Sequence, residues 1–421
     1  MNALPKIDIM EATRLTREGR LADAMAILQG TLPNGPSANF ESDAPQKPPA
    51  KSLRPMLDMV PPSMATGSSW SAPTFANAHF AAHQSPQLPE GLRGVLDRMK
   101  QLGSGLDLEV LKGLKAGVAT VALPEGAKFE ERTFTNEAGS RTYKLYVPSG
   151  YNGQAVPLVV MLHGCTQSPD DFAAGTRMNE LAEEQTFLVA YPAQPQSANP
   201  SKCWNWFSAG DQQRDRGEPS LIAGITRRIM RDFSADPDRV YVAGLSAGGA
   251  AAAIMGSAYP DLYAAIGVHS GLACGAAKDM PSAFAAMRQG GSPGATARTN
   301  DGRKRPLSTI VFHGDRDNTV SPVNGDQVIT QSKAGGDFET AVTRGQSEGG
   351  VSYTRHLQAD ERGLPILEQW VLHGAGHAWS GGSAAGSYTD PRGPDASREM
   401  LRFFLEHPRA DSMRPSIPLP S

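Results

Sequence analysis

One segment decides the fold class of this chain: Val240-Tyr-Val-Ala-Gly-Leu-Ser-Ala-Gly-Gly-Ala-Ala-Ala-Ala253. It begins with apolar residues that suit a buried strand and ends in alanines, which favour a helix. Between these parts, Gly244-Leu-Ser-Ala-Gly248 matches the pattern G-x-S-x-G. In this pattern the serine has strained backbone angles, and its glycine neighbours prevent a collision between the crossing strand and helix. The segment therefore predicts a strand, a sharp turn at Ser246 and a helix.

The same alternation of strands and helices extends to both sides of this segment. An antiparallel hairpin is expected at 129–135 and 141–147, where apolar and polar residues alternate around a turn. The other expected elements are strands at 157–162, 187–191, 240–243, 264–268, 307–312 and 366–372 and helices at 170–185, 220–233, 247–258 and 395–407. This order is typical of an α/β fold, with a mostly parallel sheet and helices on both faces.

Composition excludes several classes of protein. The 421 residues include 40 basic and 43 acidic side chains, which gives a net charge of −3, and 39% of the residues are hydrophobic. This balance argues against a nucleic-acid binder, which needs a basic face. No stretch approaches the roughly 20 apolar residues of a membrane helix. The three cysteines are too few for a disulfide scaffold and too dispersed for zinc, so no metal site is expected.

The chain divides into five expected segments. Residues 1–30 have apolar residues at roughly helical spacing and predict an amphipathic helical arm, and residues 31–93 hold 11 of the 33 prolines and predict a disordered linker. A helical lead-in at 94–127, the α/β domain at 128–408 and a flexible tail at 409–421 follow. Charges of both signs interrupt the apolar residues of the arm, unlike the apolar core of a secretory signal. We therefore expect a cytoplasmic protein, with non-classical export left open.

Ser246 needs a histidine base and an acid to orient that base, because a serine hydroxyl is a weak nucleophile near neutral pH. In sheets of this kind the three residues follow in the order serine, acid, histidine, each on a loop after a strand. Asp317 follows the strand expected at 307–312, and His377 follows the strand expected at 366–372. The sequence therefore predicts Ser246, Asp317 and His377 as catalytic residues.

Each of the two loops holds a second candidate. Asp315 competes with Asp317, which we favour because Val320 can anchor the loop while the carboxylate of Asp317 turns inward. His373 competes with His377, which we favour because its glycine-rich surroundings let the imidazole reach over the sheet edge. Structural roles are expected for the histidines at three other strand ends, His163, His269 and His313.

A tetrahedral intermediate also needs backbone N–H donors for its oxyanion. One donor should be Ala247, the residue after the nucleophile, and the other should come from the loop after the strand at 157–162. In His163-Gly-Cys-Thr-Gln167 we choose the amide of Cys165. Cys165 would then act through its backbone, because Ser246 makes a catalytic thiol unnecessary.

Five motifs occur in order between residues 132 and 405: Leu162-His-Gly-Cys-Thr-Gln167, Cys203-Trp-Asn-Trp-Phe207, Gly244-Leu-Ser-Ala-Gly248, His313-Gly-Asp-Arg-Asp317 and Gly376-His-Ala-Trp-Ser-Gly-Gly382. Together they resemble the poly(3-hydroxybutyrate) depolymerase esterase family, which is related to feruloyl and acetylxylan esterases. The resemblance implies an α/β-hydrolase fold and a serine esterase that acts on poly- or oligo-hydroxyalkanoate without a cofactor. It also implies the triad Ser246, Asp317 and His377, with Cys165 at the oxyanion site. Secreted members carry a signal peptide and often a C-terminal substrate-binding domain, whereas here a short Pro-rich tail follows Leu405.

A binding cleft is expected beside Ser246. Apolar area for an aliphatic polyester or an aromatic acyl group would come from the substrate-binding residues Trp204, Asn205, Trp206 and Trp379. The alternative for Trp204 or Trp206 is a place in the core of its loop. Cys203 and Cys274 flank this region and are the pair considered for a disulfide, with reduced buried thiols as the default in cytosol.

The sequence thus predicts a serine carboxylic-ester hydrolase that cleaves poly- or oligo-(3-hydroxybutyrate) polyesters through an acyl-enzyme. The nearest alternative is a feruloyl or acetylxylan esterase, and a different class is a noncatalytic protein that binds polyester granules. The expected partner is the polyester or oligoester substrate, without nucleic acid or a membrane span. Contact with a granule surface would involve the arm at 1–30.

Overall fold

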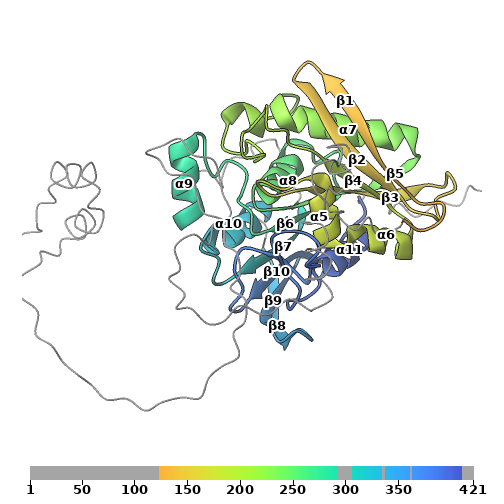
Figure 1. The fold of residues 1–421 in the computed structure, drawn as a ribbon. Helices are drawn as coiled ribbons and strands as arrows, with labels where there is room; N and C mark the ends of the chain where they lie inside the picture. Colours follow the sequence, from red (N-terminus) through yellow and green to blue (C-terminus); the bar gives the residue numbers. More distant parts are fainter. Residues whose placement is uncertain (1–122, 292–305, 334–336, 361–362, 410–421) are drawn as a thin grey trace, which may run out of the picture. The chain divides into compact units, whose positions relative to one another are not determined.

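The computed structural model describes residues 123–291, 306–333, 337–360 and 363–409. The predictions for the arm at 1–30, the linker at 31–93, nearly all of the lead-in and the tail lie outside these residues. The described parts belong to the expected α/β domain, which Figure 1 shows as a coloured ribbon.

Ten strands form one sheet in the order β1-β2-β4-β3-β5-β6-β7-β10-β9-β8. The six strands from β4 to β10 in this order are parallel, while β1 and β2 at one edge and β9 and β8 at the other run antiparallel to their neighbours. The strands are β1 (Lys128–Asn136), β2 (Gly139–Val147), β3 (Val156–Leu162), β4 (Leu188–Pro192), β5 (Ala235–Leu245), β6 (Ala265–His269), β7 (Ser308–Gly314), β8 (Glu339–Gln346), β9 (Ser352–Ala359) and β10 (Pro365–Leu372). The predicted mostly parallel sheet is confirmed.

Helices cover both faces of this sheet (Figure 1). One core includes side chains of α7 (Gly217–Asp232), α8 (Ala247–Ala258), α9 (Met280–Gln289) and α10 (Val323–Ser332). The other core includes side chains of α5 (Pro169–Thr176), α6 (Met178–Gln185) and α11 (Ala396–Glu406). Strand β3 supplies both cores, because its side chains alternate between the faces and all seven are buried.

Three smaller elements complete the described chain: the 3-10 helix η1 (Ala209–Gln212) and the short parallel pair β11 (Trp379–Ser380) and β12 (Thr389–Asp390). Among the described helices, none has the length and apolar content that crossing a membrane requires.

The structure adds α9, α10, η1 and the pair β11 and β12 to the expected elements and differs from them in two further places. The single helix expected at 170–185 is two helices, α5 and α6, because Arg177 between them has left-handed backbone angles (φ 57°, ψ 21°) and ends the first helix. The antiparallel pair β8 and β9 was not expected. Nearly every residue of β8 is exposed, so its sequence lacks the alternation of apolar and polar residues that marks a half-buried strand.

Candidate active site

Ser246 lies on the turn between β5 and α8 with φ 57° and ψ −119°, angles that a residue other than glycine rarely adopts. The turn depends on its two glycines. A Cβ atom at Gly248 would lie 2.0 Å from the carbonyl oxygen of Leu162, and one at Gly244 would lie 2.3 Å from the carbonyl oxygen of Gly248. Any side chain at either position would therefore push apart strands β3 and β5 and helix α8.

Asp317 and His377 form a buried pair on the loops after β7 and β10. Nδ1 of His377 lies 2.7 Å from Oδ2 of Asp317. The other carboxylate oxygen, Oδ1, accepts hydrogen bonds from the amides of Thr319 (2.9 Å) and Val320 (2.8 Å). Val320 also lines the pocket that contains Ser246, so the loop that carries Asp317 extends to this pocket.

The electrostatics of this pair favour an ionised Asp317. Burial opposes ionisation, but the neighbouring imidazoles of His377 and His313 hold the pKa of Asp317 well below its usual value. The ionised carboxylate is placed to accept a hydrogen bond from Nδ1–H of His377, and in that tautomer Nε2 carries the lone pair of the ring. This is the tautomer that a general base for a hydroxyl group requires.

Asp315 and His373 form a second, separate pair that is partly exposed. Oδ2 of Asp315 lies 2.9 Å from Nδ1 of His373, and its Oδ1 accepts the amide of Gly374 at 2.7 Å. Nε2 of His373 lies 2.8 Å from Oγ1 of Thr354, which joins this pair to β9. The structure thus brings Asp317 together with His377 and keeps the competing residues in a different contact.

Three further histidines at strand ends make structural contacts. Burial lowers the pKa of His163 to about 4 and that of His269 to about 3, so both rings are neutral near pH 7. His163 accepts the amide of Gln194 at 3.1 Å, His269 accepts the amide of Ser380 at 3.0 Å, and the ring of His313 contacts the carbonyl oxygen of Val320 at 2.8 Å.

The two amides predicted to bind an oxyanion lie at the same pocket, because Cys165 and Ala247 both line it with Ser246. Neighbouring amides are already used. Those of Thr166 and Ser246 donate to the carbonyl oxygens of Ser201 (2.7 Å) and His269 (2.9 Å). The amides of Cys165 and Ala247 have no acceptor among the described residues, so they remain able to bind a developing oxyanion.

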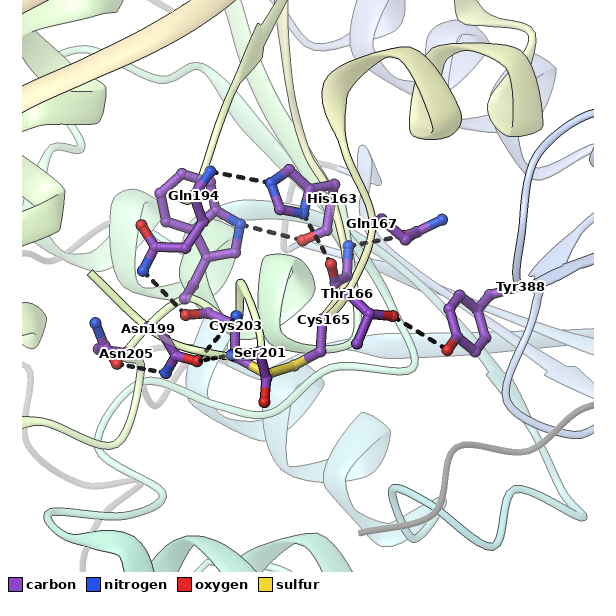
Figure 2. Close-up of a disulfide and its surroundings, with 12 residues drawn as sticks. His163, Cys165, Thr166, Gln167, Gln194, Asn199, Ser201, Cys203, Asn205 and Tyr388 are labelled. Carbon is purple, nitrogen blue, oxygen red and sulfur yellow. Dashed lines mark hydrogen bonds between the residues drawn. A yellow bond between two sulfur atoms is a disulfide. The ribbon is translucent and has the colours of Figure 1, made fainter. Parts of the chain in front are cut away.

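A disulfide joins Cys165 to Cys203 (Figure 2). The pairing of Cys203 with Cys274 considered from the sequence is therefore wrong. The loop after β4 folds back onto the loop after β3 and brings Cys203 to Cys165, whereas the backbone of Cys274 is hydrogen-bonded to the side chain of Gln331 on α10. Cys274 is a free thiol whose pKa is raised to about 11 by burial.

Apart from Ser246 itself, the side chains that line its pocket are apolar. The wall comes from the two cysteines of the disulfide, from three loops and from helices α8 and α9, and consists of Cys165, Cys203, Trp206, Phe207, Ala247, Leu272, Met280, Ala283, Phe284, Met287 and Val320. Sequence reasoning missed the contribution of α9. A capping box between Asp279 and Ser282, with Pro281 in the first turn between them, was the available signal for this helix.

Only one of the three tryptophans expected in the cleft lies there. Trp206 lines the pocket, but Trp204 is fully buried and donates its indole N–H to the carbonyl oxygen of His163 at 3.1 Å. Trp379 is also core, because it packs against Phe172 and stacks on His269. The predicted cleft positions of Trp204 and Trp379 are therefore wrong.

Asn205 does not line the pocket either, and the prediction that it binds substrate is contradicted by its contacts. Its side chain donates to Oε1 of Glu218 at 2.7 Å and accepts from Asn199 at 2.9 Å, so both ends of the amide are engaged within the protein. Across the described ranges, no group of three or more His, Cys, Asp or Glu side chains is arranged to hold a metal ion.

The disulfide assignment predicts a specific pattern of thiol reactivity. If free thiols are alkylated before digestion, the native protein should yield one linked pair of peptides that contains Cys165 and Cys203. Cys274 should be alkylated much more slowly in the native protein than after denaturation, because its raised pKa keeps the thiol protonated. Mass spectrometry of non-reduced and reduced digests checks this, and a linked peptide containing Cys274 would contradict it.

Comparison with known proteins gives a family match. Residues 141–349 match the family model described as esterase PHB depolymerase, a range that includes Ser246 and Asp317. Poly(3-hydroxyalkanoate) depolymerase C of Paucimonas lemoignei is 34% identical over 250 residues, which are 58% of this chain and 59% of that protein. Poly(3-hydroxybutyrate) depolymerase of Ralstonia pickettii is 28% identical over 250 residues, which are 56% and 50% of the two chains. The chain thus spans between half and three-fifths of these two relatives.

Related esterases match as well. Feruloyl esterase B of Neurospora crassa is 29% identical over 292 residues, which are 64% of this chain and 89% of that protein. In the solved acetyl xylan esterase from Aspergillus awamori the fold is similar, with a TM-score of 0.51 at 20% identity over 66% of this chain and 99% of that one. This likeness supports the α/β-hydrolase fold. Residues 141–349 thus match the family described as esterase PHB depolymerase, and the chain is similar to esterases of that kind.

Proposed function

We propose that this protein is a serine carboxylic-ester hydrolase that cleaves poly- or oligo-(3-hydroxybutyrate) polyesters through an acyl-enzyme. The observation that carries the proposal is a single pocket in which the strained Ser246 is surrounded by apolar side chains and by two unused amides. The Asp317–His377 pair lies on the loops of neighbouring strands and reaches this pocket through Val320.

The chemistry follows from these groups. Oγ of Ser246 bonds to the ester carbonyl carbon while its proton passes to Nε2 of His377, and the amides of Cys165 and Ala247 bind the resulting oxyanion. Collapse of this intermediate expels the alkoxide, which takes the proton from His377 and leaves as the alcohol. A water molecule then repeats the sequence on the acyl-enzyme and releases the acid. Asp317 stabilises the imidazolium that forms in each half-reaction.

The pocket wall favours an aliphatic ester over a carbohydrate ester. Hydrocarbon and thioether side chains, among them Leu272, Met280 and Met287, surround Ser246, and the lining includes no charged residue. A sugar ring exposes hydroxyl groups that would need hydrogen-bond partners when desolvated. The methyl-bearing backbone of a hydroxybutyrate oligomer needs none. Trp206 and Phe207 would also suit an aromatic acyl group, so feruloyl ester hydrolysis is the second candidate.

Two parts of the proposal concern the whole protein. A cytoplasmic location and contact of the arm at 1–30 with a polymer granule stay predictions, and the arm lies outside the described residues. The disulfide Cys165–Cys203 is of a kind maintained in oxidising compartments, so the redox state of these cysteines in cells bears directly on the location.

A substrate panel tests the proposed specificity. The kcat/KM for a hydroxybutyrate trimer should exceed that for methyl ferulate by about tenfold, because several aliphatic units contact the apolar wall, and acetylated xylan should be the poorest substrate. Ser246→Ala should lower every activity by about 10³-fold or more. Preference for ferulate would support the second candidate, and binding to polymer granules without hydrolysis by the wild type would support a noncatalytic binding protein.

The two aspartates give a second test. Asp317→Asn should lower kcat by about 10⁴-fold, because an amide cannot hold the Nδ1–H tautomer of His377. Asp315→Asn should leave kcat within about threefold, because it affects only the separate contact with His373. Steady-state kinetics, with circular dichroism as the check on folding, measures both. If Asp315→Asn were the more damaging change, the acid role would move to Asp315.

A further inference from the structure

The loop that carries Trp206 is held by a buried carboxylate that the proposed mechanism does not use. We call residues 199–207 the tryptophan loop. Glu218, in the first turn of α7, accepts two hydrogen bonds from Asn205 of this loop: the backbone amide donates to Oε2 and the side-chain amide donates to Oε1, each at 2.7 Å. Asn205 directly precedes Trp206, so these bonds fix the backbone next to the pocket wall.

A second connection runs through Gln194, which follows β4. Its Nε2 donates both to Oε1 of Glu218 and to the carbonyl oxygen of Cys203, the latter at 3.0 Å. Figure 2 shows Gln194 reaching Cys203, whose sulfur is bonded to Cys165. Glu218 is thus connected to the tryptophan loop at both Cys203 and Asn205, on either side of the buried Trp204.

The charge surroundings of Glu218 are sparse. Its side chain is 7% exposed, the guanidinium of Arg141 on β2 lies 3.8 Å away, and the carboxylate of Asp211 on η1 is nearby. Burial, together with Asp211, raises the pKa of Glu218 to about 7 although its hydrogen bonds oppose this. Burying a carboxyl group costs free energy unless its oxygens are hydrogen-bonded. For Glu218, the hydrogen bonds to the tryptophan loop offset part of that cost.

Trp206 borders a second, smaller cavity besides the pocket at Ser246, and Glu218 lines that cavity with it. The indole itself is buried and packs edge-on against Phe207, so its position depends on where the backbone of the loop is held. The hydrogen bonds from Asn205 to Glu218 supply that restraint.

We propose that Glu218 is a positioning residue for acyl-chain selectivity: it anchors the tryptophan loop so that Trp206 forms the wall of the pocket at Ser246. This inference rests on the proposed ester hydrolysis but not on the identity of the natural ester. Glu218 touches neither substrate nor the reacting atoms, and it acts through Asn205 and Trp206.

The two carboxylate oxygens explain why the residue is an acid. Oε1 accepts from the side chains of Gln194 and Asn205, and Oε2 accepts from the backbone amide of Asn205. In Glu218→Gln, either orientation of the new amide would point its N–H groups at an existing donor and lose at least one of these bonds. The variant keeps the size of the side chain and removes its ability to accept on both sides.

The test compares p-nitrophenyl hexanoate with p-nitrophenyl acetate at pH 8, where Glu218 is mostly ionised. The longer acyl chain should contact more of the apolar wall than the acetyl group does. Glu218→Gln should raise KM for the hexanoate about fivefold to tenfold and leave kcat for the acetate within about twofold. In a Trp206→Ala background, which itself lowers the hexanoate-to-acetate ratio of kcat/KM about tenfold, Glu218→Gln should change this ratio no further.

Glu368→Gln is the matched control, because Glu368 is also a buried carboxylate, and it contacts Arg355, Arg402 and Trp370 away from the tryptophan loop. It should lower the melting temperature without changing the hexanoate-to-acetate ratio. If Glu218→Gln does not fold, Asn205→Ala replaces it, since that change removes the side-chain bond to Glu218 and should lower the same ratio.

Two results would overturn the inference: equal losses on both esters, or the same change in the ratio with and without Trp206. These outcomes differ from failure of the proposed function. Suppose that the p-nitrophenyl esters give the expected results for Glu218→Gln with and without Trp206→Ala, but that the protein does not cleave the hydroxybutyrate trimer. Glu218 would then keep its positioning role, and the polyester assignment would be wrong.

Discussion

The candidate active site depends on the close crossing of β3, β5 and α8. The carbonyl oxygen of Leu162, at the end of β3, occupies the space that a Cβ atom of residue 248 would need. This contact forces glycine at 248, and the turn it permits gives Ser246 its strained angles. It also places the loop that follows Leu162 beside the serine. Ser246, the proposed nucleophile, and the loop with Cys165 are therefore neighbours, because β3 pairs with β5 and α8 crosses both strands closely.

The other half of the site is joined to this crossing by β6, which lies between β5 and β7. The carbonyl oxygen of His269 accepts a hydrogen bond from the amide of Ser246. The ring of His269 accepts one from the amide of Ser380, which lies three residues after His377. Trp379 stacks on the same ring and its indole N–H donates to Ser397 on α11 at 3.0 Å. The neutral, fully buried His269 thus connects the turn at Ser246 to the loop that carries His377.

Much of this was predictable from sequence, for physical reasons. Strands buried on both faces are continuous apolar runs, so the parallel sheet and the loops that carry Asp317 and His377 follow from order along the chain. Contacts between residues that only the three-dimensional fold brings together could not be predicted from the sequence. The meeting of Cys165 with Cys203 depends on how an irregular loop folds back, and the burial of Trp379 depends on packing against α5 and β6. An aromatic residue near a catalytic histidine has the same sequence pattern whether it faces substrate or core.

The central claim is that Ser246 is the nucleophile activated by the Asp317–His377 pair. The most direct measurement is covalent labelling with a fluorophosphonate, which reacts with an activated serine, followed by mass spectrometry of the digested protein. The account predicts one adduct, on the peptide that contains Ser246, with labelling abolished in Ser246→Ala and slowed by about 10³-fold in His377→Ala. An adduct on another residue, or labelling that persists at the wild-type rate in His377→Ala, would contradict it.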